Sequence, residues 1–301
     1  MDGKVMTMAE AVARNVSDGD MVAIEGFTHL ISFAAGHEII RQGRRHLTLA
    51  RLTPDLVYDQ MVAAGVADRI VFSWLGNPGA GSLHAIRRRI EEASLEIEEY
   101  THMAMVARYE AAARGLPFSP LLSFEGSDLP AVNPRLRRVA DPYGGAEVWV
   151  VPPLAPDVTI VAVQRADAEG NAQIWGLTGC QREAAFAARR VVVVCEELVA
   201  SDVIRSDPNR TLIPGLIVDA VVVEPGGCHP SYAQGHYDRD NRFYLDWEPI
   251  SRSPAGLETW LDEWVLGVEG RAGYLEKLGE RWPALRPGPA PAAPIDYGWY
   301  G

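Results

Sequence analysis

The amino-acid sequence predicts an α/β fold: an open, mostly parallel sheet with helices on both faces. The first observation is that short apolar runs alternate with amphipathic stretches of about 10–15 residues, as in successive βαβ units. The second is that several apolar runs lack regular polar alternation, which is typical of parallel strands covered on both faces. The clearest of these runs are VTIVAV at 158–163, RVVVVC at 190–195 and IVDAVVV at 217–223.

The same alternation predicts each element in turn. Helices are expected at 7–16, 32–43, 53–65, 82–94, 101–115, 180–190, 256–267 and 270–282, and further strands at 21–26, 47–52, 69–76 and 95–100. Thr7 and Glu10 have capping-box spacing at the start of the first helix. Thr53 followed by Pro54 predicts a helix that begins with Thr53 as its N-cap.

Composition bounds the class of protein. The chain has 301 residues, 48% of them apolar, and a formal net charge of -12, so a large core is possible and nucleic acid is an unfavourable partner. Cys180, Cys195 and Cys228 form no CxxC pair and suggest free thiols. We see no signal peptide or membrane-spanning run and expect a soluble, cytoplasmic protein.

The chain reads as a single domain followed by a tail. Residues 1–282 carry the alternating pattern, and the Pro- and Gly-containing stretch at 123–153 is expected to be an excursion within that fold. Residues 283–301 are rich in Pro, Ala and Gly and predict an extended tail.

The loops after the strands are the places to look for chemistry, because open parallel sheets bind ligands outside the carboxyl ends of their strands. After the first strand, Gly26 would let the backbone approach a ligand, and the amides of Phe27 and Thr28 could hold an anion or an oxyanion. An ordinary strand-to-helix turn with Glu25 partly solvated is the alternative. Both interpretations remain open from the residues alone.

Three further loops carry candidate residues. Asn77 and Gly79 lie in a glycine-rich turn that lacks dinucleotide-binding spacing, and an ordinary βα turn explains it better than a ligand loop does. His102 starts a helix after a strand, where it could transfer protons or simply cap the helix. Gly226, Gly227 and His229 follow the most apolar strand. Metal-ligand spacing is absent there, so we predict no metal site.

The assembled stretches resemble the A (α) subunit of family I CoA-transferases, most closely the glutaconate CoA-transferase type. The similarity runs from about residue 4 to about residue 278 and is carried by AVARNVSDGDMVAIEGFT, HEIIRQGRRHLT, EEYTHMAMVARYEAAARGLPF, AQIWG, VVVVCEELVASDVIRSDPNRTLIPGLIVDAVVVEPGGCHPS, YDRDN and YLEKLG. It implies the open α/β fold of the NagB, RpiA and CoA-transferase superfamily. It also implies a B (β) subunit partner, in A2B2 or larger assemblies, with the active site between the two kinds of chain.

The resemblance also implies a reaction. A B-subunit glutamate attacks an acyl-CoA and passes CoA to a second carboxylic acid through an enzyme-bound anhydride and thioester. Coenzyme A is then a substrate, and no permanently bound cofactor is expected. This chain contains no Ser/Gly-Glu-Asn-Gly-like loop for that glutamate, which fits an A subunit that is inactive alone.

By the same resemblance, Gly26, Phe27 and Thr28 match a Gly-Gly-Phe-like loop whose amides hold the thioester oxyanion. Glu25 stands where glycine is common and is expected to be a pocket carboxylate or an interface ion-pair partner. Asn77 and Gly79 are expected to line the acyl or pantetheine cleft, and Gly226, Gly227 and His229 its far wall. His29, Leu30 and Ile31 replace basic residues of relatives, which suggests a bulkier or less charged acyl group.

One other enzymatic function stays open, and a regulatory one is disfavoured. A related branch of the family hydrolyses a carbon–carbon bond in ring-bearing acyl-CoA intermediates of steroid breakdown, and it has a glutamate where His102 stands here. Because His102 is also a proton-transfer residue, a ring-opening hydrolase is the main alternative. Sugar-responsive repressors share the superfamily fold, but they carry a basic DNA-binding module that this sequence lacks.

Overall fold

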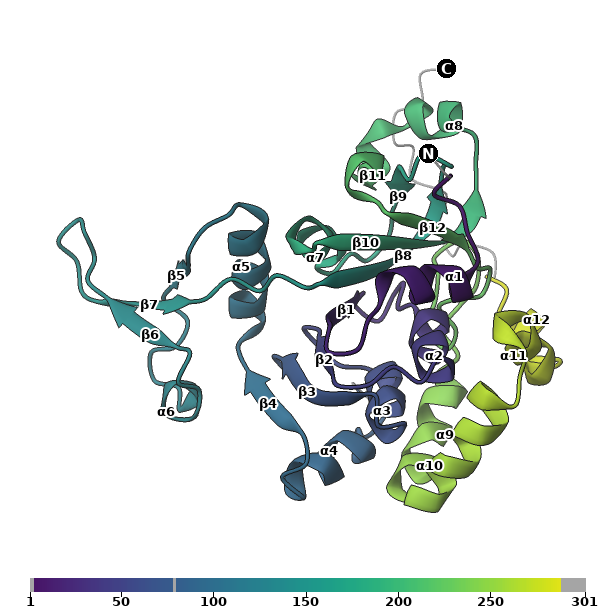
Figure 1. The fold of residues 1–301 in the computed structure, drawn as a ribbon, viewed down its shortest axis with the longest axis horizontal. Coiled ribbons are helices and arrows are strands. Elements are labelled where there is room, and N and C mark those ends of the chain that lie inside the picture. The colour runs from purple at the N-terminus through teal and green to yellow at the C-terminus, as the bar shows by residue number, and fades with distance from the viewer. Residues whose placement is uncertain (1–2, 78–79, 288–301) are drawn as a thin grey trace.

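A nine-stranded sheet forms the centre of the molecule (Figure 1). The computed structural model describes residues 3–77 and 80–287. Seven strands are parallel in the order β12-β10-β8-β1-β2-β3-β4, and β9 and β11 add an antiparallel extension. These strands are β1 (Met21–Glu25), β2 (Leu47–Ala50), β3 (Ala67–Phe72), β4 (Glu96–Glu99), β8 (Val158–Ala166), β9 (Ala172–Gln173), β10 (Arg190–Leu198), β11 (Thr211–Ile213) and β12 (Ala220–Val223).

Helices cover both faces of this sheet, as the sequence predicts. In β10, Val192 packs into a core shared with α1 to α4, α9 and α10, whereas Val193 packs into a second core on the opposite face. A third core joins α5 and α7 to the sheet. The helices are α1 (Met8–Asn15), α2 (Phe33–Arg41), α3 (Leu56–Ala63), α4 (His84–Glu91), α5 (His102–Ala113), α7 (Gln181–Ala187), α8 (Ser201–Ser206), α9 (Asn241–Arg252), α10 (Pro254–Leu261), α11 (Gly270–Leu278) and α12 (Arg281–Ala284).

The strand order places a topological switch point between β1 and β8. From β1 the chain moves outward through β2, β3 and β4, and the second half moves outward in the other direction through β8, β10 and β12. Loops that leave the carboxyl ends of β1 and β8 therefore separate to opposite sides and leave a crevice between them. Such a crevice is the usual ligand site of an open α/β sheet.

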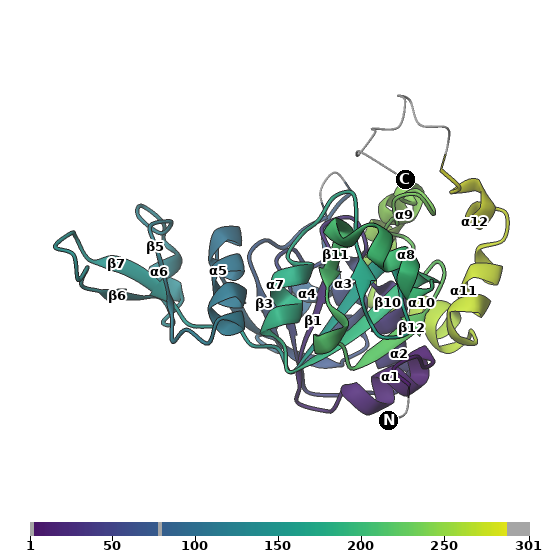
Figure 2. The ribbon, with the colours of Figure 1, turned by 90° about the horizontal axis from the view of Figure 1, so that it is seen from above.

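The stretch at 123–153 forms most of a small arm rather than a plain loop. Three antiparallel strands, β5 (Ser119–Leu121), β7 (Val148–Val151) and β6 (Arg137–Val139), together with α6 (Leu129–Val132), extend away from the main sheet in both views (Figures 1 and 2). The base of the arm is tied to β4, because Arg135 forms an ion pair of 3.1 Å with the buried Glu98.

Several local predictions can be compared with the structure. The capping box of Thr7 and Glu10 is confirmed. The predicted start of the third helix is wrong, because α3 begins at Leu56 and its N-cap is Asp55. Thr53 is instead held in a loop, where its carbonyl accepts a hydrogen bond of 2.7 Å from Arg51 Nε.

The predicted tail at 283–301 lies mostly outside the described residues, although α12 extends to Ala284. Within the described ranges, no helix has the length and apolarity that crossing a membrane would require.

Candidate active site

The ends of four neighbouring parallel strands meet around one cavity of about 230 Å³. Parallel strands bring their carboxyl ends to the same edge of the sheet, so residues far apart in the sequence converge there. The lining residues are Gly26, Phe27 and Thr28 after β1, Arg51, Thr53 and Asp55 after β2, Trp74 after β3, and His102 at the start of α5. The structure thus brings together the two regions that sequence reasoning favoured most, the loop after the first strand and His102.

The loop after β1 has an unusual backbone that its surroundings hold in place. Thr28 has a φ of 56°, in the left-handed region that a β-branched residue rarely adopts. Ser231 Oγ donates a hydrogen bond of 2.8 Å to the Thr28 carbonyl, and Leu30 N–H donates one of 2.9 Å to the Tyr232 carbonyl. The segment after β12 therefore supports the loop from behind.

The amides of Phe27 and Thr28 are free of internal partners. In the part of the chain that the structure describes, neither N–H donates a hydrogen bond to another residue. A backbone N–H without an acceptor is costly unless water or a ligand satisfies it. Two adjacent unpaired donors on a cavity-lining loop are suited to a carbonyl oxygen that gains negative charge.

Glu25 lies inside the protein instead of facing the cavity. Only 1% of its surface is exposed, and its Oε1 accepts hydrogen bonds from Tyr109 Oη at 2.9 Å and Leu52 N–H at 3.3 Å. Burial raises the pKa of Glu25, and the positive charge of Arg51 opposes that rise. The expectation of a pocket carboxylate or an interface ion pair is therefore corrected: Glu25 is a buried support of the loop.

His102 is exposed at the cavity and is held through both ring nitrogens. Its Nε2 lies 3.1 Å from Thr53 Oγ1, and its Nδ1 lies 3.2 Å from Ser73 Oγ. The Phe27 ring meets it edge-on with 6.5 Å between centroids. Because Ser73 Oγ donates its proton to the Leu52 carbonyl at 2.5 Å, it accepts from His102 Nδ1–H, which leaves Nε2 to accept from Thr53 Oγ1. The ring is therefore fixed at the cavity wall with both of its nitrogens engaged.

Asn77 does not line this cavity. Asn77 is buried in a turn where it bridges to Gly81, and its Oδ1 lies 3.4 Å from Arg239 Nη2. Its Nδ2 has no hydrogen-bond partner within the described residues. Gly79 lies outside the described residues.

Gly226, Gly227 and His229 also lie away from the cavity. His229 is fully buried, its Nδ1 lies 2.9 Å from Tyr274 Oη, and its Nε2 lies 3.1 Å from Asp240 Oδ2. Burial lowers the pKa of His229 to about 4. The structure therefore corrects the expected far wall: these residues anchor the C-terminal helices, and no described atom of them lines this cavity.

The suggestion of a less charged pocket rested on three residues that do not line the cavity. His29, Leu30 and Ile31 are all fully buried, so their side chains do not face the cavity. His29 Nε2 accepts a hydrogen bond of 3.1 Å from Gln234 N–H, which leaves Nδ1 as the donor to the Leu177 carbonyl at 2.7 Å. Arg51 lines the cavity, but its guanidinium is engaged by the carbonyls of Ile24, Gly26 and Thr53.

Sequence reasoning missed Arg51, Thr53 and Trp74. Arg51 reads as the end of a strand and Thr53 as a helix cap, so neither stands out. Trp74 has a signal that the sequence shows, because it is a large aromatic residue just past the end of a buried strand. In the structure its side chain is 43% exposed. Its ring lies over Gly76, where an added Cβ would come within 2.5 Å of it.

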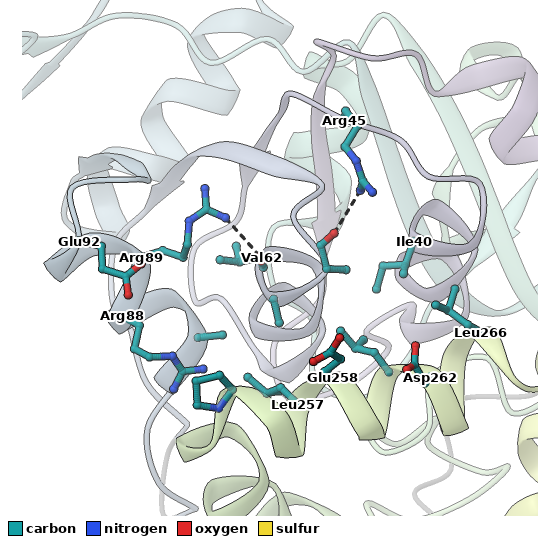
Figure 3. A pocket seen from close by; sticks show the side chains of 15 residues that line it. Ile40, Arg45, Val62, Arg88, Arg89, Glu92, Leu257, Glu258, Asp262 and Leu266 are labelled. Carbon is teal, nitrogen blue, oxygen red and sulfur yellow. Dashed lines mark hydrogen bonds between the residues drawn. The ribbon is translucent and has the colours of Figure 1, made fainter.

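A second cavity of about 620 Å³ lies at the opposite edge of the sheet (Figure 3). It is bounded by α10 and by the carboxyl-terminal ends of α2, α3 and α4, which run back toward the start of the strands. Arg45 and Arg89 donate hydrogen bonds to the carbonyls of Ala64 and Val62 at the end of α3. These arginines complement the negative end of the helix dipole. Glu258 and Asp262 also line the cavity, so it has no single charge sign.

No group of three or more His, Cys, Asp or Glu side chains among the described residues is arranged to hold a metal ion. All three cysteines are buried and unpaired. Burial raises the pKa of each thiol, to about 12 for Cys195, which suits none of them for nucleophilic work.

Comparison with known proteins identifies the family. The chain is 47% identical over 280 residues to the A subunit of the 3-oxoadipate CoA-transferase of Pseudomonas knackmussii, covering 92% of this chain and 99% of the relative. It superimposes on the crystal structure of glutaconate coenzyme A-transferase from Acidaminococcus fermentans with a TM-score of 0.90 and 32% identity, covering 97% of this chain and 98% of the other.

A more distant relative, the cholesterol ring-cleaving hydrolase IpdA subunit of Mycobacterium tuberculosis, is 28% identical over 189 residues, which is 58% of this chain and 63% of that relative. Residues 5–224 match the sequence profile of the family described as Coenzyme A transferase. The chain therefore belongs to the Coenzyme A transferase family.

Proposed function

We propose that this chain is the A subunit of a heteromeric CoA-transferase that moves CoA between an acyl-CoA and a dicarboxylic acid of the 3-oxoadipate class. The observation that carries the proposal is the pair of unpaired amides at Phe27 and Thr28, in a loop at the carboxyl end of the sheet whose residues border a cavity. The dicarboxylic class follows from the relative at 47% identity.

The nucleophile has to come from a second polypeptide. Asp55 is the one carboxylate among the described residues lining the cavity, and its Oδ1 accepts a hydrogen bond of 2.7 Å from Leu56 N–H as a helix cap. Glu25 is buried behind the loop. We assign the attacking carboxylate to a glutamate of the B subunit, with the two chains assembled as A2B2 or a larger complex.

The proposed reaction needs no proton transfer. The B-subunit carboxylate attacks the thioester carbonyl, and the negative charge that develops on its oxygen is held by the amides of Phe27 and Thr28. Collapse expels CoA as a thiolate and leaves an acyl–glutamyl anhydride. The thiolate then attacks the glutamyl carbonyl, which releases the first acid and leaves a glutamyl-CoA thioester. The second acid, as its carboxylate, reverses these steps and leaves with CoA.

The test is co-expression with a B-type subunit, followed by an assay of acetyl-CoA, succinyl-CoA and glutaryl-CoA, each with and without 3-oxoadipate or acetate. The proposal expects a new acyl-CoA that appears only when an acceptor acid is present, and no turnover by either chain alone. Release of free CoA at the same rate without any acceptor would contradict it and would favour the hydrolase alternative.

The hydrolase alternative rests on the similarity to the ring-cleaving hydrolase and on the exposed His102 beside the amides. A hydrolase would have to remove a proton from water, a task that a histidine can perform. The buried, unpaired cysteines fit a reducing compartment for either enzyme, and we place the reaction in the cytoplasm.

A further inference from the structure

We propose that Arg51 and Gly179 are positioning residues for the Phe27 amide: Arg51 fixes the direction of its N–H, and Gly179 keeps the space beside it open. The inference deepens the proposed function, on which it rests for the identity of the group that occupies that space. That group is the carbonyl oxygen of an acyl-CoA thioester.

Arg51 holds the peptide unit to which the Phe27 N–H belongs. Its side chain is 1% exposed, and its guanidinium donates hydrogen bonds to the carbonyls of Ile24 at 2.7 Å and Gly26 at 2.5 Å. The peptide bond between Gly26 and Phe27 is planar and trans, so its C=O and N–H point in opposite directions. Because Arg51 binds the C=O on the β2 side, the N–H of Phe27 must point away from Arg51.

Gly26 cannot be replaced to test this, because the loop folds back tightly on it. An added Cβ at Gly26 would come within 2.5 Å of the Leu30 carbonyl oxygen and 2.7 Å of the His29 carbonyl oxygen. A Gly26→Val variant would therefore disturb the backbone of the whole loop. The orientation of the amide has to be tested through its neighbours.

Gly179 is the neighbour on the other side. A Cβ built on Gly179 would lie 3.3 Å from Phe27 N and 3.0 Å from Phe27 Cβ. A hydrogen-bond acceptor of an amide sits at about 2.7–3.2 Å from the nitrogen, so a methyl group 3.3 Å from Phe27 N would crowd an acceptor bound on that side. Gln181 Oε1 accepts a hydrogen bond of 2.7 Å from Gly179 N–H and holds this glycine in place.

The strand order gives independent support. Gly26 and Phe27 follow β1, whereas Gly179 belongs to the loop that follows β8 and β9. These are the two sides of the topological switch point, where open α/β sheets bind their ligands. The Phe27 N–H, directed away from β2, is therefore directed toward that crevice.

The first variant is Gly179→Ala, with Gly273→Ala as its matched control. Gly179 does not have a positive φ, so alanine fits its backbone, and the close contacts require shifts of only a few tenths of an ångström. We expect kcat to fall about 100-fold with KM within about 3-fold, the size of effect seen when one oxyanion donor is lost. Gly273, where a Cβ would meet Val268 at an ordinary 3.6 Å, should retain full activity.

The second variant is Arg51→Lys, with Arg271→Lys as its control. Arg271 is also buried and also holds two backbone carbonyls, those of Gly226 at 2.8 Å and His229 at 2.5 Å, but it does not line the cavity. Lysine keeps the positive charge but loses the planar guanidinium, whose N–H groups can bind two carbonyls at once. Both variants should be less stable than the wild type. Only in Arg51→Lys should kcat, measured per folded molecule, fall by about 10-fold or more.

The decisive readout is the infrared carbonyl band of [1-¹³C]succinyl-CoA bound to the two-subunit complex. The inference expects a shift to lower frequency in the wild type that disappears in Gly179→Ala and persists in Gly273→Ala. An unshifted wild-type band, or an unchanged shift and kcat in Gly179→Ala, would overturn it. If the band behaves as expected but no acceptor-dependent transfer occurs, the positioning role stands and the proposed function fails.

Discussion

Replacing His102 with glutamine separates the two reactions that this site could catalyse. The imidazole makes two hydrogen bonds to neutral hydroxyls, at 3.1 Å to Thr53 and 3.2 Å to Ser73. A glutamine amide has one acceptor end and one donor end and can replace one of these two hydrogen bonds. The His102→Gln variant therefore loses one neutral hydrogen bond, worth about 1 kcal/mol, if the histidine only orients groups.

The two functions then predict different losses. In the transfer reaction every nucleophile is already an anion, so a loss of about 1 kcal/mol corresponds to about a 5-fold fall in kcat. In a hydrolase, His102 would accept a proton from water, and its removal would cost about 10²–10⁴-fold. The measurement is steady-state kcat with succinyl-CoA and 3-oxoadipate, at several pH values.

The control for this experiment is His46→Gln, because His46 is exposed, does not line the cavity, and has Asp68 as its one polar partner among the described residues. It should leave kcat unchanged. A loss of 100-fold or more in His102→Gln would refute the reasoning that the transfer proceeds without proton transfer by this chain.

Three further outcomes follow from the structure. Trp74→Ala should raise KM for succinyl-CoA about 10-fold with little change in kcat, because an exposed aromatic wall of the cavity is lost; Leu216→Ala, equally apolar but 93% exposed, should not. Gly226→Ala should lower the melting temperature, since the φ of Gly226 is 73° and an added Cβ would lie 2.7 Å from Leu275. The kcat per folded molecule should stay unchanged, and a loss of kcat without a loss of stability would show that Gly226 belongs to the active site. Burial raises the pKa of Glu196 to about 7 from 4.5, so the folded state keeps a proton that the unfolded state releases, and stability should fall as pH rises through this range. In thermal melts between pH 5 and 8, the melting temperature of Glu196→Gln should fall less with rising pH than that of the wild type. An equal fall of the two melting temperatures would contradict this.

The fold could be predicted because its signals are local. Capping boxes, terminal glycines and apolar periodicity lie within one element, and the parallel order follows from their alternation. The start of α3 was predicted wrongly, because Thr53 followed by Pro54 is a common helix start, although Asp55 is the stronger type of cap. Which of them caps the helix depends on Arg51, whose guanidinium holds the Thr53 carbonyl inside the site.

The candidate site was predictable where the topology alone decides position. The loop after the first strand and His102 both follow strand ends, and a parallel sheet brings them together. Gly226 and His229 also follow a strand, but long-range contacts with Arg271 and Tyr274 turn that segment toward the C-terminal helices. No feature within the segment itself signals that turn.

The most direct test is a crystal structure of the two-subunit complex with a stable acyl-CoA analogue in which the thioester sulfur is replaced by a methylene. We predict that the acyl oxygen lies about 2.7–3.2 Å from Phe27 N, with a B-subunit carboxylate facing the carbonyl carbon. An acyl oxygen bound elsewhere, with the Phe27 N–H donating to a protein group, would contradict the account.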